Sequence, residues 1–182
     1  MVEARYDNFW RRLGAIFVDA LVIAPFGLFV HKLIQLPAFN QHGVAVALAL
    51  QSACVYAYQV ILTRQYGQTV GKMATGVVAV MLDEQRLPTW RASFLREGFI
   101  TITNVVGVVY DITRVYHGTY FEDPNGHTPA TYALAVFMLA MLLIEIVPFM
   151  LTDKQRAAHD YVGGTVVVKK SMSIFADKTE QL

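Results

Sequence analysis

ATYALAVFMLAMLLIEIVPFML, residues 130–151, decides the fold class, because Glu145 is the single charged side chain in a run long enough to cross a bilayer. A membrane-spanning helix needs about 20 predominantly apolar residues. Of the 182 residues, 55% are hydrophobic and 16% are charged, whereas an average soluble domain has about 25% charged residues. One water-excluding core could not enclose this much apolar surface, so the sequence predicts that lipid surrounds most of the chain.

Four such runs predict an all-α membrane protein with four transmembrane helices, at about 13–30, 44–62, 92–113 and 130–151. The third run is the shortest, since its uncharged part lies between Glu97 and Asp111. A full span must include both acids and Arg96, whose side chains would snorkel to the interface. The alternative is a re-entrant or interfacial helix. The first run lacks a signal-peptide cleavage site, so we expect it to be retained.

Basic residues predict the orientation of the four helices. Of the 15 Lys and Arg residues, only Lys32 and Arg114 lie in the two connections assigned to the outside. All others lie in the N-terminus, in segment 63–96 or after residue 151. Basic loops stay in the cytoplasm, so we expect both termini on the cytoplasmic side. The membrane is expected to be the inner (cytoplasmic) membrane of the cell.

A small β-hairpin-like segment is predicted on the cytoplasmic side, within 63–91. Residues 75–82 are rich in β-branched side chains and are followed by the polar turn 83–86. Residues 163–169 have the same strand character, and pairing the two pieces would satisfy edge groups that neither satisfies alone. Residues 1–170 are therefore predicted as one transmembrane domain, followed by a polar tail at 171–182.

Asp19 is the most informative polar residue, because a carboxylate at the centre of a membrane helix costs about 2.5–3.5 kcal/mol unless it faces protein or water. Arg12 lies two turns earlier on the same helix face, roughly 10 Å away along the axis. We expect both to line one polar stripe, with Arg96 as the third group. This stripe is either an ion or proton pathway, or a buried ion pair that fixes helix register.

Two other features concern the helices themselves. Glu145 near Pro148 is either a second carboxylate for cation binding or an interfacial acid, since proline leaves a carbonyl unpaired nearby. The second helix repeats alanine every fourth residue, at Ala45, Ala49, Ala53 and Ala57. Small residues at this interval let helices approach closely, which predicts packing within the chain or between copies.

Several functions are disfavoured by the sequence. Segment 67–73 resembles a phosphate-binding loop but has one spacer residue too few and Met73 where Ser or Thr is required. His159-Asp160 has no second histidine at metal spacing, and no catalytic set is recognisable. A net charge of +1 argues against nucleic-acid binding. We therefore expect no enzyme activity, no metal and no cofactor.

Three segments taken together resemble the RDD family of bacterial membrane proteins, which is named for one arginine and two aspartates. They are FWRRLGAIFVD at 9–19; GKMATG at 71–76 with WRASFLR at 90–96; and DKQRAAHD at 153–160, which runs into GGTVVV at 163–168. The resemblance spans roughly residues 6–100 and 150–168. It assigns the arginine to Arg12, with Arg11 as a possible substitute, and the aspartates to Asp19 and Asp160.

The resemblance implies a family of broadly unknown function, in which transport is suggested and cation/proton exchange is proposed for some members. Two hypotheses follow. In the first, the chain is a small carrier that works as an oligomer, and Asp19 alternates between protonated and cation-bound forms. Alternatively, it is a non-transporting accessory protein that packs against other membrane proteins.

Overall fold

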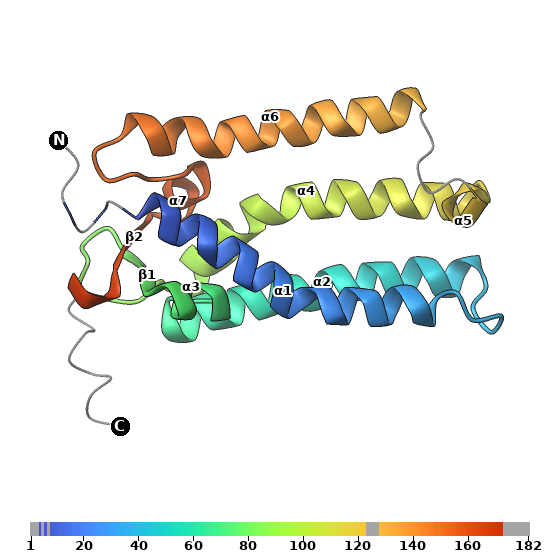
Figure 1. The fold of residues 1–182 in the computed structure, drawn as a ribbon, viewed down its shortest axis with the longest axis horizontal. Coiled ribbons are helices and arrows are strands. Elements are labelled where there is room, and N and C mark those ends of the chain that lie inside the picture. The colour runs from blue at the N-terminus through green and yellow to red at the C-terminus, as the bar shows by residue number, and fades with distance from the viewer. Residues whose placement is uncertain (1–3, 5, 7, 123–127, 173–182) are drawn as a thin grey trace.

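The computed structural model describes residues 4, 6, 8–122 and 128–172. Its four long helices are α1 (Phe9–Leu33), α2 (Gln41–Tyr66), α4 (Trp90–Tyr116) and α6 (Pro129–Leu151) (Figure 1). All four are long and apolar enough to cross a membrane, which confirms the predicted fold class. The third predicted run is one continuous helix of 27 residues.

Three of the long helices, α2, α4 and α6, begin just before the predicted apolar runs, next to a polar residue that caps them. Asn40 accepts a hydrogen bond from the Gly43 amide at the start of α2, and Thr89 and Thr128 cap α4 and α6 in the same way. Such caps satisfy amides that have no partner inside the helix. Gly67, with a φ of 66°, ends α2 in the left-handed conformation that glycine adopts most easily.

The shorter elements gather at one end of the bundle, which we term the sheet end. They are α3 (Val70–Thr75), β1 (Val77–Met81), α7 (Ala158–Gly163), β2 (Thr165–Lys169) and the 3₁₀ turn Lys170–Met172; α5 (Thr119–Glu122) lies at the opposite end. Strands β1 and β2 pair antiparallel, from Val77 opposite Lys169 to Met81 opposite Thr165. The predicted strand pairing is confirmed, although two long helices separate the strands in the sequence.

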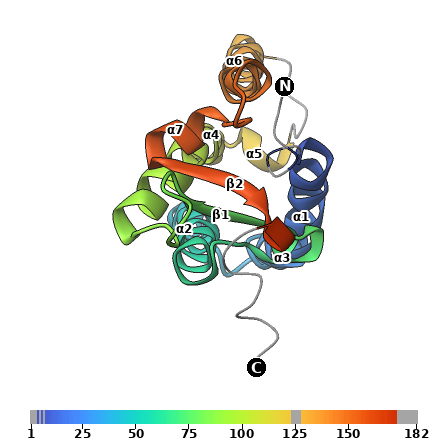
Figure 2. The same ribbon diagram turned by 90° about the vertical axis from the view of Figure 1, so that its left-hand side faces the viewer.

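The two-stranded sheet is buried on both faces, as its position among the helix ends in Figure 2 indicates. One face packs in a cluster of Tyr6, Val78, Val80, Val166 and Val168, and the other consists of Val77, Ala79 and Val167. Polar side chains occupy its outer edges. Asn8 donates to the Val167 carbonyl, Gln68 to that of Val77 and Arg156 to that of Thr165, so these three edge carbonyls already have partners.

Helix α6 stands apart from the other three (Figures 1 and 2). Only 6% of its most apolar window is buried within the chain, compared with 22% for α2 and α4. Near the sheet end Phe149 packs against Phe9. Near the other end Thr131 bonds the Tyr110 hydroxyl. Most of the α6 surface is therefore left to lipid or to another helix.

The alanine repeat of α2 divides between two environments. Ala45 is buried, beside Val44 and Leu48 of the apolar cluster at the opposite end of the bundle. Ala49, Ala53 and Ala57 are exposed, so none of the described helices covers them. Packing of these three against another chain stays a prediction.

Candidate functional site

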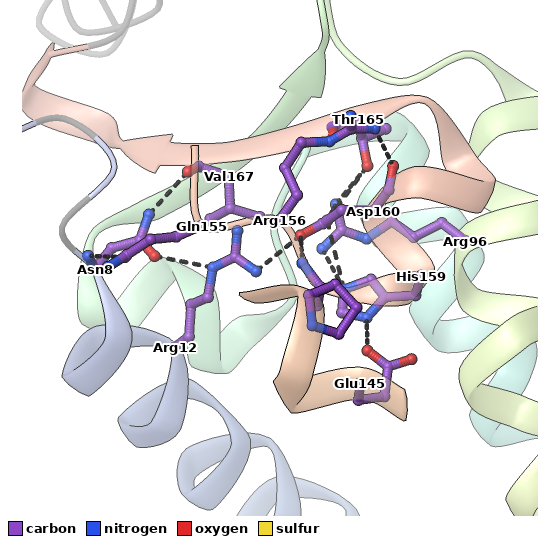
Figure 3. A network of polar contacts seen from close by, with 12 residues as sticks. Asn8, Arg12, Arg96, Glu145, Gln155, Arg156, His159, Asp160, Thr165 and Val167 are labelled. Atoms are coloured by element: carbon purple, nitrogen blue, oxygen red, sulfur yellow. Dashed lines mark hydrogen bonds and ion pairs between the residues drawn. The ribbon is translucent and has the colours of Figure 1, made fainter. Parts of the chain in front are cut away.

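Asp160 is the centre of a buried charge cluster at the sheet end (Figure 3). Its side chain is fully buried; Oδ2 lies 2.8 Å from Arg12 Nη1 and Oδ1 lies 3.1 Å from Arg96 Nη1. The Ala157 amide also donates to Oδ2. Burial alone would raise the pKa of Asp160, but the two guanidinium groups outweigh it and hold that pKa well below its ordinary value.

Arg96 connects α4 to the segment that carries α7 and β2. Its side chain is 1% exposed, and its guanidinium donates to the Thr165 hydroxyl and to Nε2 of His159, each at 3.2 Å. Gly163 permits this close approach, since a Cβ there would lie 2.8 Å from the Cβ of Arg96 and 3.0 Å from a backbone oxygen of α4. Arg96 is therefore held by protein groups and does not snorkel.

Glu97 and Lys72 extend the cluster toward α2 and α3. The Thr63 hydroxyl donates to Glu97 Oε1 at 2.8 Å, and the Lys72 ammonium lies 3.9 Å from the same oxygen. Burial lowers the pKa of Lys72, and the positive charge of Arg96 acts in the same direction. We expected the Glu97 side chain to reach the interface, but the structure buries it between Lys72 and Arg96.

Arg12 is positioned by groups that the sequence argument did not identify. Its Nε donates to Asn8 Oδ1 at 2.9 Å, and Asn8 in turn holds β2 through the Val167 carbonyl at 2.8 Å. The Arg12 guanidinium also lies over the ring of Phe149, at 5.1 Å from its centre. The neighbouring Arg11 is exposed and caps the end of α3 through the Thr75 carbonyl, so Arg12 takes the arginine position in the cluster.

Asp19 occupies a second, separate polar site. Its carboxylate accepts from the Gly71 amide at 2.8 Å, from the Thr69 hydroxyl at 2.5 Å and from the Tyr58 hydroxyl at 3.2 Å. These donors belong to the first turn of α3 and to α2. A Cβ on Gly71 would lie 2.1 Å from the Ala15 carbonyl oxygen, so only glycine lets α3 approach α1 this closely.

The prediction that Arg12, Asp19 and Arg96 line one polar stripe is wrong. The structure brings Arg12 and Arg96 together on Asp160, while Asp19 binds α3. The reason is the axial rise between the two α1 residues, which leaves room for α7 beside Arg12 and for α3 beside Asp19. Glu145 joins the cluster through His159, 2.6 Å from Nδ1.

The fold and this site together define a multi-pass membrane protein whose buried ionic cluster joins the ends of its helices. The model of the RDD family matches residues 6–164, and the chain belongs to that family. No curated protein and no solved structure matched the chain. In the described ranges, no three His, Cys, Asp or Glu side chains are grouped as a metal site would require.

Proposed function

We propose that this RDD-family protein exchanges a monovalent cation or another small solute for protons, with Asp19 as the exchanging carboxylate. One observation carries the proposal: every donor to Asp19 is neutral. Within the described residues no side-chain nitrogen of Lys, Arg or His lies within 4.0 Å of the oxygens of this carboxylate. By contrast, Asp160, Glu97 and Glu145 each face a basic side chain.

The chemistry of the Asp19 site suits exchange. A carboxylate held by hydroxyl groups can take up a proton or a small cation without displacing a fixed positive charge. The hydroxyls of Thr69 and Tyr58 can rotate from donating to accepting, and would then offer oxygen ligands beside the carboxylate. Oxygen ligands suit hard cations. The neighbouring ionic cluster would hold the surrounding helices while Asp19 changes its state.

The proposed orientation places the sheet end in the cytoplasm and the chain in the inner membrane. All Lys and Arg residues except Lys32 and Arg114 then lie at the cytoplasmic face or beyond it, as the positive-inside rule requires. Lipid is the principal partner of the four helices. In this proposal the protein is a carrier and not an enzyme.

Flux measurements in proteoliposomes test the exchange. Purified protein is reconstituted with a pH-sensitive dye inside the vesicles, and Na⁺, K⁺ or Li⁺ is added outside. We expect cation-dependent proton movement that Asp19→Asn abolishes. Asp111→Asn is the matched control, because Asp111 is a half-buried acid of α4 outside both polar sites. Normal flux in a well-folded Asp19→Asn protein would refute the proposal.

A role as an accessory protein in a larger membrane assembly is the second candidate. It is favoured by the low burial of α6 and by the outward-facing Ala49, Ala53 and Ala57 of α2. A stoichiometric membrane partner or second copy, retained in mild detergent and lost when Ala53 is replaced by Leu, would support this role. Absence of flux from the wild type alone would favour it over exchange.

A further inference from the structure

His159 lies between two long helices that make little direct contact. Its Nδ1 is 2.6 Å from Glu145 Oε2 on α6, and its Nε2 is 3.2 Å from Arg96 Nη2 on α4. The same Nε2 is also 3.5 Å from Asp160 Oδ1. Figure 3 shows the ring between these partners. His159 is thus the side chain through which α6 reaches the buried ionic cluster.

The partners fix the protonation of the ring. A guanidinium has only donors, so Nε2 must accept from Arg96 and cannot carry a hydrogen in this arrangement. Nδ1 then holds the single ring hydrogen and donates it to Glu145. These partners correspond to a ring with one hydrogen, whose lone pair is directed at a positive charge.

We infer that Nε2 of His159 is a proton-binding site, and that proton capture exchanges its partner from Arg96 to Asp160. Once Nε2 carries a hydrogen, it repels the guanidinium and can donate to the Asp160 carboxylate. The bond from Nδ1 to Glu145 becomes charge-assisted and stronger. Acidification thus weakens the α4–α7 junction and strengthens the α6–α7 junction. This inference goes beyond exchange at Asp19 and does not depend on it.

Charges on every neighbouring element bear on this proton. The facing groups are Glu145 of α6, Arg96 and Glu97 of α4, Asp160 of α7 itself, Arg12 of α1 and Arg156 of the preceding loop. Lys72 of α3 adds an ammonium beside Glu97. Three carboxylates therefore face three guanidinium groups and one ammonium, so a proton captured by the ring adds to an existing excess of one positive charge.

Nitrogen NMR of ¹⁵N-histidine-labelled protein in lipid tests the assignment directly. At about pH 8 we expect hydrogen on Nδ1 and none on Nε2, whereas a spectrum recorded in acid should show hydrogen on both nitrogens. The spectrum of His159→Gln identifies the signals by their loss. If that variant does not fold, replacing the other histidines leaves His159 as the one signal. Hydrogen on Nε2 at about pH 8 would overturn the inference, as would a ring that stays neutral at about pH 5.

Hydrogen exchange tests the consequence for the junction. Gln at position 159 can accept from Arg96 and donate to Glu145, yet it cannot take up a proton. We expect the amides of α7 to lose protection severalfold between about pH 8 and about pH 5 in the wild type and not in His159→Gln. His42→Gln, at the opposite end of the bundle, should behave as the wild type. Equal loss in the wild type and in His159→Gln would refute the partner exchange. Asp19→Asn should retain it, so the two proposals can fail separately.

Discussion

Arg12 and Asp160 lie 148 positions apart in the sequence, yet their side chains meet at 2.8 Å. Arg12 is in the first turn of the first long helix, and Asp160 follows the last one. Their ion pair therefore closes the four-helix arrangement at the sheet end. Arg96 approaches the same carboxylate from the third long helix, so one buried acid holds two cations.

Asp160→Asn should destabilise the protein strongly. Removing one partner of a buried ion pair leaves its cations uncompensated, which costs about 3–5 kcal/mol. Thermal unfolding in detergent measures the change. Asp83→Asn is the control, because Asp83 and Arg86 form an exposed pair expected to contribute less than about 1 kcal/mol. Similar melting temperatures for Asp160→Asn and the wild type would contradict this account of the cluster.

The same carboxylate predicts how stability depends on pH. The pKa of Asp160 is lowered in the folded protein from its ordinary value of 3.8. A carboxyl group whose pKa is lowered by folding stabilises the folded state fully at any pH above its pKa in the unfolded chain. This contribution decreases below that pH and is lost as the pH falls through the pKa in the folded protein. Below about pH 4 the loss is about 1.4 kcal/mol per pH unit. The gap in melting temperature between wild type and Asp160→Asn should therefore narrow from about pH 6 to about pH 3. A constant gap would show that Asp160 is not the titrating group.

Gly71→Ala should separate α3 from α1. The added Cβ would meet the Ala15 carbonyl oxygen at 2.1 Å and the Asp19 carboxylate at 2.8 Å, and backbone cannot move aside cheaply. A loss of about 1–3 kcal/mol is expected, as for an overpacked core. At Gly107 the nearest atom, the end of Met138, is 3.7 Å away. Gly107→Ala should therefore be neutral or stabilising by up to about 1 kcal/mol. Comparable unfolding curves for Gly71→Ala and Gly107→Ala would show that α3 does not approach α1 as closely as described.

Cysteine labelling tests the orientation. In a Cys54→Ala background, an impermeant maleimide added to spheroplasts should label His117→Cys and leave Ser171→Cys unlabelled. Both positions are exposed, at opposite ends of the bundle. Inverted membrane vesicles should give the reverse pattern. Labelling of Ser171→Cys in intact spheroplasts would place the sheet end outside.

The sequence predicts those helices and strands whose formation depends on the composition of one continuous segment. Apolar length predicted four helices, and β-branched composition predicted that 75–82 would pair with 163–169. The site depended on pairings between distant segments. Asp19 binds the start of α3 about 50 residues later, and no spacing within α1 could reveal this. The sequence around His159 suggests a metal ligand without a second histidine and a place in the RDD-like segment 153–160. Its roles as acceptor and donor depend on residues of two other helices, which no local pattern reveals.

Because Asp160 and β2 come after α6, the sheet end cannot be completed until the ribosome has translated the chain beyond residue 169. During biogenesis Arg12, Arg96 and β1 would wait beside the membrane without their final partners. A nascent chain that stops after α6 retains all four hydrophobic segments for insertion, but it lacks the acid that neutralises two arginines. Membrane insertion and maturation of this protein are therefore distinct events, and the second requires the segment that follows α6.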